Sequence, residues 1–405
     1  MLPLPGIDME ALYFVAYGGG WGGPATIFAM IAGGDIGTLF AMGIAPYITA
    51  SIIMQLLTYA IPKLSEMQKD GEDGRKKIEQ ITRYLAVGLA AVQASAQVFM
   101  WTRLPIGDGT QSINLFRHAN FFAYLIAVTA MIAGTIFIMW LAELLTERGV
   151  GNGASFLIFA NILAAMPNDI ATLYMAAINA ENLILGWLQV GVMLIVFAAI
   201  IAFVVLVHEG ERRIPVQYAK GAAAGRRSFG NQSSYIPLKV NIAGVLSIIF
   251  AVSLLQFPVQ IAMFFPNSAA LQTMRSFLDI SHNIHWVGLS LYVILIFAFT
   301  HFYTSFAVNA VEMAENMKKN GGVIPGVRSG KPTSEYIQVT VDRLSWIGSV
   351  FYALIALIPI LLQWITGWQL GFGGTTILIA TGVALEFIKQ LESQLLMRHY
   401  KGFLN

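Results

Sequence analysis

Residues 183–207, LILGWLQVGVMLIVFAAIIAFVVLV, form an apolar stretch of 25 residues without an Asp, Glu, Lys or Arg. A helix of about 20 such residues crosses the hydrocarbon core of a bilayer. The composition of the chain agrees, since 57% of its 405 residues are hydrophobic and 11% are charged, against about 25% charged in ordinary soluble domains. Single apolar cores stop growing at roughly 250 to 300 residues, so the sequence predicts an all-α polytopic membrane protein.

Eight further apolar stretches lie between charged segments in the same way. Spans of about 17 to 25 residues are expected for transmembrane helices. The nine predicted spans are residues 38–61, 84–102, 119–142, 150–167, 183–207, 240–264, 285–311, 345–366 and 371–388.

Basic residues alternate between the segments that join these spans. The segments after the first, third, fifth and seventh spans, together with the C-terminal tail, contain 21 of the 24 Lys and Arg residues. The segments after the even-numbered spans contain the other three, and residues 1–37 contain none. Because basic residues are retained on the cytoplasmic side, we expect the N-terminus outside and the C-terminus in the cytoplasm.

Spans and charges together divide the chain into four predicted parts. Residues 1–37 form an external segment, and residues 38–182 form an N-terminal half with four spans. Residues 183–239 contain the fifth span and a basic cytoplasmic segment. Residues 240–405 complete the C-terminal half with four spans, a cytoplasmic segment at 312–344 and the cytoplasmic tail.

Two segments outside the regular spans have an unusual composition. The stretch between Tyr17 and Phe40, GGGWGGPATIFAMIAGGDIG, has eight glycines in twenty residues. Irregular backbone at membrane depth must be buried in protein or line a cavity, so this stretch is either a pore-lining element or a plain external loop. The second segment holds five basic residues within sixteen positions, more than retention requires: Arg212, Arg213, Lys220, Arg226 and Arg227. It is either a topology signal alone or a docking surface for an acidic or nucleic-acid partner.

The usual marks of transporters and enzymes are missing from the sequence. Ion-coupled transporters place Asp, Glu, Lys or Arg inside their spans, but here such residues stand only at span ends, as Glu386 does. The chain has no cysteine, and His282 and His285 form a surface pair without a carboxylate motif, so we expect no metal site and no cofactor. A secondary transporter, favoured by the short fourth span, and an intramembrane protease remain as alternatives to a channel.

Two pairs of apolar residues recur at helical spacing. Ile44 and Ile48 share one face of the first span, and Ala154 and Ile158 share one face of the fourth. Such residues in a membrane helix usually face lipid or pack against a neighbour, so the spacing alone assigns them no role.

Several long motifs give the chain a resemblance to a known family. Met42–Leu57, MGIAPYITASIIMQLL, resembles the first signature of the SecY family, and Trp140–Ile162, WLAELLTERGVGNGASFLIFANI, resembles the second. Other segments match in the same order: IPVQYAK at 214–220, IPLKVNIAGV at 236–245, KKNGGVIPGVRSGKPTSEYI at 318–337, FGGTT at 372–376 and ESQLLMRHYKGFL at 392–404. The resemblance covers nearly the whole chain.

The resemblance implies a two-half helical bundle around a central pore that passes unfolded polypeptide and does not catalyse a reaction. Carried over by position, the apolar pore ring is Ile44, Ile48, Ala154, Ile158, Ile249 and Ile379. Residues 21–37 match the family's plug. Gln55 and Asn152 match polar positions near the lateral gate, which opens between the first two spans and the sixth and seventh.

The same resemblance implies partners and a membrane. Arg328 matches a key arginine of the family, and Lys220, Arg226 and Arg227 match the basic tip that docks the ribosome or the SecA motor ATPase. The expected subunits are SecE and SecG, with SecDF, YidC, signal sequences and membrane lipids as further partners. The expected location is the bacterial inner membrane, with the thylakoid membrane as the alternative.

The chain also departs from the family pattern. The family has ten spans, and Leu2–Asp8, LPLPGID, match the end of its first span. Either the start codon was assigned downstream of the true one or this is a reduced form; we favour the first, since loss of a helix exposes its neighbours' packing surfaces. Ala154 replaces a bulky ring residue, Ser247 replaces a common proline, and Ala310 interrupts a usual Asn-Pro. A ring with one alanine is expected to be wider and to leak ions slightly more.

Overall fold

The computed structural model describes residues 2–8, 37–102, 104–106, 111–117, 120–178, 183–218, 234–240, 242, 244–263, 265, 268–278, 285–366 and 374–402. Its long helices are α3 (Ala45–Ala60), α5 (Glu72–Trp101), α6 (Phe121–Arg148), α7 (Gly153–Ile178), α8 (Leu183–Glu209), α9 (Leu246–Met263), α11 (Trp286–Ala307), α13 (Lys331–Thr366) and α14 (Gly374–Gly402). Shorter elements are α4 (Pro62–Lys69), α10 (Ala269–Leu278), α12 (Ala310–Lys319), β1 (Leu104–Ile106), β2 (Gln111–Ile113), β3 (Glu211–Tyr218), β4 (Ser234–Lys239) and β5 (Gly322–Val323).

The helical prediction is confirmed, and each of the nine predicted spans coincides with one of the long helices. Five of these helices are long and apolar enough to cross a membrane on their own: α5, α6, α8, α11 and α13. A sixth crossing is formed if α3 and α4, which meet at a bend of 105°, count as one broken span. The total of nine spans stays a prediction.

Several helices run well beyond the predicted spans. α5 begins at Glu72, where a span was expected from residue 84, and α13 begins at Lys331 rather than at 345. Hydropathy marks the part of a helix that lies in lipid, whereas polar residues continue the same helix into water. In the first turns of α5, Lys76 and Glu72 form an ion pair of 3.2 Å at i, i+4 spacing.

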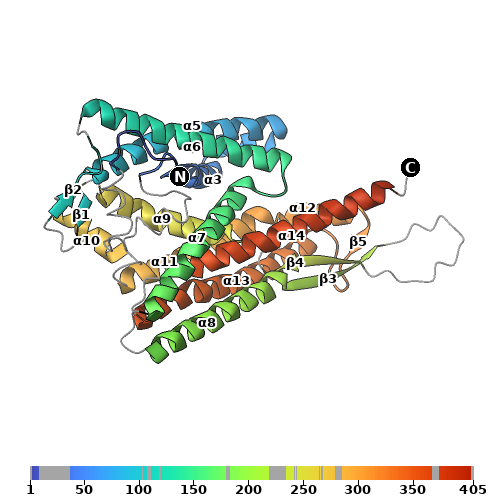
Figure 1. Cartoon of the computed structure of the whole chain (residues 1–405). Coiled ribbons are helices and arrows are strands. Elements are labelled where there is room, and N and C mark those ends of the chain that lie inside the picture. Colours follow the sequence, from blue (N-terminus) through green and yellow to red (C-terminus); the bar gives the residue numbers. More distant parts are fainter. Residues whose placement is uncertain are drawn as a thin grey trace, which may run out of the picture.

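The N-terminal half, defined here as α3 to α7, is held together by close helix contacts (Figure 1). Ala86, Ala90 and Ala94 repeat every four residues along α5 and are all buried, which lets α5 approach its neighbours α3 and α6 closely. On α6, a Cβ added at Gly134 would lie 2.3 Å from the carbonyl oxygen of Leu39. This half therefore packs through small residues, as membrane helices commonly do.

The C-terminal half, defined here as α8 to α14, forms a second group of neighbouring helices. α11 packs between α9 and α13, α13 packs against α14, and α14 packs against α8. Helices of the two halves contact each other on two sides of the bundle. α3 contacts α9 on one side, and α7 contacts α8 and α14 on the other.

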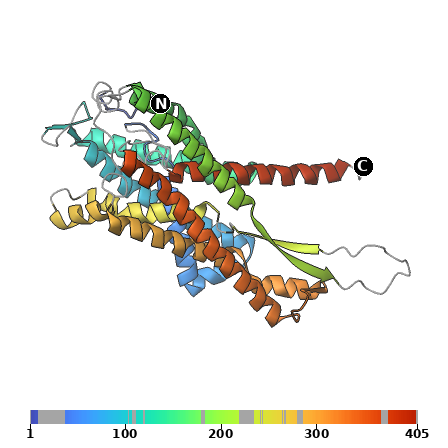
Figure 2. The ribbon, with the colours of Figure 1, turned by 90° about the horizontal axis from the view of Figure 1, so that it is seen from below.

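One end of the bundle, which we call the hairpin end, carries a small sheet that was not predicted (Figure 2). β3 pairs antiparallel with β4 and also with β5, which precedes α13 in the chain. Ile214 and Val216 alternate along β3 with exposed residues and are buried against Ile324 and the helices α12 and α13. The sheet thereby joins the described strands of segment 208–239 to β5 in segment 312–344.

The opposite end carries the β1–β2 hairpin and α10 (Figure 1). Here Leu2–Asp8, which resemble the end of a span, are not helical. Isolated β-bridges join Pro3 to Thr38 and Ile7 to Phe116. Leu4 and Ile7 are buried with residues of α5 and α6, so these residues pack against those helices at this end of the bundle.

Candidate functional site: an apolar constriction and the seam beside it

The six predicted ring residues lie in one apolar cluster at the centre of the bundle, which we call the constriction cluster. Ile44 and Ile48 come from the start of α3, Ile158 from α7, Ile249 from α9 and Ile379 from α14, and all five are buried. Ala154, one turn before Ile158, is half-buried and packs against the same cluster. Both halves of the chain therefore contribute to the constriction cluster.

Its chemistry follows from the side chains. Branched apolar groups offer water and ions no hydrogen bonds, so a narrow passage lined by them excludes both by dewetting. The constriction cluster has other buried members that were not predicted from the sequence, because nothing in an apolar helix marks which of its faces turns inward. They include Ile248, Leu255, Tyr292, Ile355 and Leu378. Among the described residues, no group of three or more His, Asp or Glu is placed to hold a metal ion.

Beside the constriction cluster, α3 meets α9 and α11 along what we call the α3–α11 seam. The hydroxyl group of Tyr303 on α11 donates a hydrogen bond to Oε1 of Gln55 on α3. Nε2 of Gln55 also donates to Ser51 Oγ at 3.3 Å. The Tyr303 ring packs at 5.0 Å from that of Phe250 on α9. The predicted gate residue Gln55 thus bonds directly across the seam, to a partner 248 residues away in the chain that sequence reasoning did not find.

Ring contact continues the seam toward the hairpin end. Tyr59 of α3 and Phe302 of α11 meet edge to face, with ring centroids 5.5 Å apart. The seam is therefore closed by side-chain contacts, which can separate without breaking a backbone hydrogen bond.

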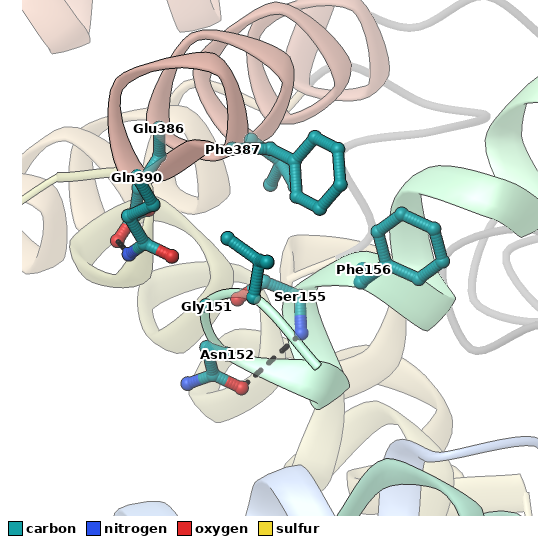
Figure 3. Close-up of a pocket in the computed structure, with 9 residues that line it drawn as sticks. Gly151, Asn152, Ser155, Phe156, Glu386, Phe387 and Gln390 are labelled. Atoms are coloured by element: carbon teal, nitrogen blue, oxygen red, sulfur yellow. Dashed lines mark hydrogen bonds between the residues drawn. The ribbon is translucent and has the colours of Figure 1, made fainter. Parts of the chain in front are cut away.

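Asn152, the second predicted gate residue, lies elsewhere. Its Oδ1 accepts hydrogen bonds from the backbone N–H groups of Ala154 at 3.0 Å and Ser155 at 3.4 Å, and so caps the N-terminus of α7. It lines a pocket between the α6–α7 turn and α14, together with Glu386 and Gln390 (Figure 3). None of the residues lining this pocket belongs to α3, α9 or α11, so the structure does not bring Asn152 together with Gln55.

The basic residues of the predicted docking surface lie at the hairpin end. Arg212 and Arg213 are exposed on β3, and Arg328 is exposed in the turn between β5 and α13. Pairing of Gln217 with Val323 brings the strand and the turn into one sheet. The predicted positions Lys220, Arg226 and Arg227, like residues 21–36 of the predicted plug, lie outside the described residues.

Neighbouring groups hold Arg213 and Arg328 in place. Nε of Arg213 donates to Glu211 Oε1 at 2.6 Å, and its guanidinium lies 4.9 Å from the centre of the Tyr235 ring. The hydrogen bond with Glu211 raises the pKa of Arg213, whose guanidinium is charged at physiological pH in any case. The backbone carbonyl of Arg328 accepts a hydrogen bond of 2.8 Å from Thr333 Oγ1, which leaves its side chain free to point into solvent.

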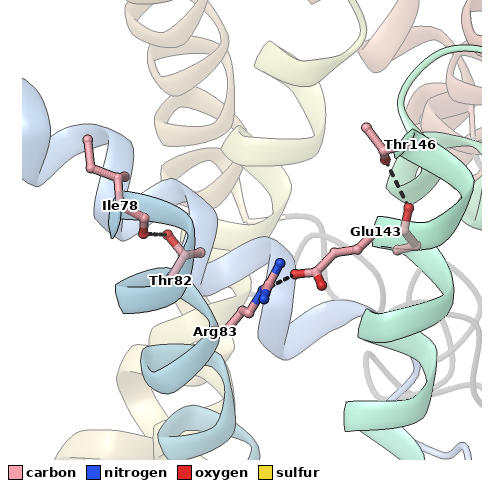
Figure 4. Close-up of polar contacts among 6 residues, drawn as sticks. Ile78, Thr82, Arg83, Glu143 and Thr146 are labelled. Carbon is pink, nitrogen blue, oxygen red and sulfur yellow. Dashed lines mark hydrogen bonds and ion pairs between the residues drawn. The ribbon is translucent and has the colours of Figure 1, made fainter. Parts of the chain in front are cut away.

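An ion pair joins α5 to α6 in the N-terminal half (Figure 4). Arg83 Nε donates to Glu143 Oε1 at 2.6 Å, and the Glu143 side chain is 21% exposed. The pair links α5 to α6 directly, although the Arg83 side chain is 41% exposed and solvent screening therefore limits what the pair contributes. Both residues fall just outside the predicted spans, and sequence reasoning did not connect them.

These features define a class of protein: a polytopic helical membrane protein whose two halves pack together around one apolar cluster. Residues 38–388 match the SecY family. The chain is 42% identical to the protein translocase subunit SecY of Streptomyces scabiei, over 100% of this chain and 92% of that protein. It is 40% identical to that of Synechococcus elongatus, over 100% of this chain and 90% of that protein. This chain belongs to the SecY family.

Solved structures show the same fold. A solved structure described as that of a protein conducting channel superposes on this chain with a TM-score of 0.64 at 19% identity. The superposition covers 97% of this chain and 94% of the other. Sec61 in the canine ribosome–channel complex from the endoplasmic reticulum superposes with a TM-score of 0.59 at 18% identity, with the same coverage.

The hydrogen bond across the seam leads to a prediction. Tyr303→Phe removes the donor to Gln55 and leaves a poorly solvated acceptor, so the free energy of unfolding in mild detergent should fall by about 1 kcal/mol. Tyr59→Phe is the matched control, because it keeps its ring contact with Phe302 and the residue is 76% exposed, and should change stability by less than about 0.5 kcal/mol. Equal effects of the two substitutions would show that the bond contributes nothing.

Proposed function

We propose that this chain is the central subunit of a protein-conducting channel, which passes unfolded secretory polypeptides across a membrane and releases hydrophobic segments sideways into lipid. The observation that carries the proposal is the constriction cluster, which combines Ile44 and Ile158 of one half with Ile249 and Ile379 of the other. A channel subunit of this family is not an enzyme, so the work of transport comes from a partner.

The constriction cluster suits a passage that opens only for polypeptide. When idle, buried isoleucines leave no wetted path. When a chain enters, the same side chains form an apolar ring around it, because rotation of aliphatic groups adapts to any passing residue. The ring thereby limits ion leakage during transport without recognising a particular sequence.

The α3–α11 seam suits lateral release. Separation of α3 from α9 and α11 breaks side-chain contacts, among them the Gln55–Tyr303 hydrogen bond and the Tyr59–Phe302 ring contact. A segment that meets the opening partitions into lipid according to its own hydrophobicity. The recognised property of a signal sequence is therefore helix hydrophobicity.

The hairpin end suits docking of the partner that supplies energy. Arg212, Arg213 and Arg328 present positive charge there on exposed side chains, which favours anionic RNA or an acidic protein surface. We assign this end to the cytoplasm, and to SecA or the ribosome as its partners. SecE and SecG complete the translocon, SecDF and YidC associate with it, and the membrane is the bacterial plasma membrane or the thylakoid.

Reconstitution tests the proposed function. Vesicles containing the chain with SecE and SecG should protect a signal-bearing precursor from external protease, and protection should require SecA and ATP. Precursor that stays accessible in the presence of all components would contradict the proposal. Uptake of a small solute driven by an ion gradient would favour a secondary transporter instead.

The residue at position 154 tests the constriction. Ala154 packs against the cluster but remains half-buried, so Ala154→Ile should fill the passage and lower the idle conductance measured in planar bilayers. Ala133→Ile, on the exposed face of α6, is the control and should leave the conductance unchanged. A conductance of Ala154→Ile no lower than that of the parent would remove this position from the ring.

The docking surface gives a separate prediction. Arg328→Glu reverses the charge of an exposed side chain, so transport driven by SecA or the ribosome should fall while membrane insertion of the channel is unchanged. Arg275→Glu on α10, at the opposite end of the bundle, is the charge-matched control. Precursor protection by Arg328→Glu equal to that by Arg275→Glu would count against a docking role.

A further inference from the structure

The sheet at the hairpin end contains the dipeptide Ile-Pro three times (Figure 2). It occurs at 214–215 in β3, at 236–237 in β4 and at 324–325 directly after β5. All three isoleucines pack in the apolar cluster that holds the sheet against α12 and α13. All three prolines are exposed. Packing of the sheet therefore accounts for the isoleucines and leaves the prolines unexplained.

The register of β3 with β4 shows where two of the prolines point. Pro215 of β3 lies opposite Tyr235, and Pro237 of β4 lies opposite Arg213 in the same antiparallel ladder. In such a ladder, pairs that exchange two backbone hydrogen bonds alternate with pairs that exchange none. A proline has no N–H group and is confined to positions that face away from the partner strand. The two pairs are two residues apart and so of the same kind, which places both proline nitrogens on outer edges of the β3–β4 ribbon.

The pairing of β5 agrees with this orientation. Gln217, two residues after Pro215, faces the same edge of β3 and pairs there with Val323 of β5. Continued in this register, the next hydrogen-bonded pair would join Pro215 to Pro325. Neither proline carries an N–H group, so the ladder ends there and β5 is two residues long.

The prolines interrupt both outer edges of the sheet. An added strand bonds to the outward N–H and C=O groups of every second residue along an edge. On β4 the outward residues are Tyr235, Pro237 and Lys239, so the middle donor of the three is missing. On β3 the outward row is broken at Pro215, next to the residues that already pair with β5. Neither edge offers a continuous template for another strand.

The substrate of the proposed channel makes an open sheet edge a hazard. An unfolded polypeptide carries unpaired backbone groups and can add as a strand to an exposed edge. We assign the hairpin end to the cytoplasm, so a polypeptide that awaits transport reaches the sheet before it reaches the constriction cluster. A strand captured at the sheet would hold that polypeptide outside the channel.

We propose that Pro215, Pro237 and Pro325 block strand addition at the hairpin end, and so keep the sheet from capturing the unfolded polypeptides that the channel passes. Pro237 protects the edge of β4, and the other two protect the edge of β3. The sheet then presents its charged side chains to a docking partner without offering its backbone to the substrate. This inference rests on the proposed channel function.

Substitution of Pro237 tests the block in the complete chain. Pro237→Val restores the missing N–H group on the outer edge of β4. Ile236→Val is the matched control, because it places valine in the same strand without adding an outward donor. Lys239→Cys, on the same edge, is introduced into the parent and into both variants, since the chain contains no cysteine.

Capture is read from a disulfide at position 239. Each protein, in vesicles with SecE and SecG, is mixed with a reduced, unfolded polypeptide that has one cysteine and no signal sequence. The adduct yield should rise about fivefold in Pro237→Val, as expected for one gained backbone hydrogen bond, and stay at the parent level in Ile236→Val. Equal yields in the two variants would overturn the proposal.

Hydrogen exchange tests the orientation of the prolines separately. In Pro215→Val, the new amide at position 215 faces the carbonyl group of Pro325 and should be protected, because the ladder with β5 grows by one step. In Pro237→Val, the new amide at position 237 faces solvent and should exchange quickly until unfolded polypeptide is added. Fast exchange at 215, or protection at 237 without polypeptide, would contradict the proposal.

Transport by the same proteins separates this inference from the proposed function. If the parent protects no precursor, the channel function fails, and the adduct yields still decide whether the prolines block capture. If the parent protects precursor, Pro237→Val and Ile236→Val should match it, and an excess of the unfolded polypeptide without a signal sequence should then inhibit Pro237→Val alone. Equal inhibition of the two variants would count against a role of the block in transport.

Discussion

Burial of isoleucine side chains from both halves in one cluster is the constraint on which the rest of the structure depends. Ile44 and Ile48 of α3 can be shielded only if α7, α9 and α14 converge on them. In a bilayer the hydrophobic effect does not drive helices together, so packing and close backbone approach must do so. The alanine repeat of α5 and the glycines of α6 and the α6–α7 turn supply that approach.

The two sides of the constriction cluster are built differently. Along the α3–α11 seam the halves meet through side chains, such as Gln55 with Tyr303. Along the α7–α14 side they meet where backbone at Gly151 lies against Gln390. Side chains change rotamer in ps to ns, whereas packed helices move as units. The polar elements at the hairpin end lie outside this arrangement.

Hydropathy and charge predicted much of the fold, because lipid demands apolar surface on every spanning helix. All nine predicted spans coincide with helices. The small sheet at the hairpin end was not predicted, since β5 is only two residues long and its pairing with β3 is non-local. The extension of α5 and α13 beyond the spans was missed because hydropathy reports the solvent around a helix and not its hydrogen bonds.

Prediction of the site residues from the sequence was limited in a similar way. The six apolar residues came from resemblance and not from spacing, since isoleucine in a membrane helix looks the same whether it faces lipid or a neighbour. Tyr303 carried no local signal, because its partner Gln55 lies 248 residues away in the chain. Asn152 was assigned to the gate by its match to a polar position of the family, and in the structure it caps α7.

The central claim is that the buried constriction cluster becomes the path of a polypeptide. The direct measurement places one cysteine at a time in the cysteine-free chain and asks which positions form a disulfide with a cysteine in an arrested precursor. Ile379 is 0% exposed and Ile195 is 71% exposed in the idle structure. The account predicts an adduct at Ile379→Cys during transport and none at Ile195→Cys, although the second is far more accessible at rest. Adducts at Ile195→Cys without adducts at Ile379→Cys would contradict it.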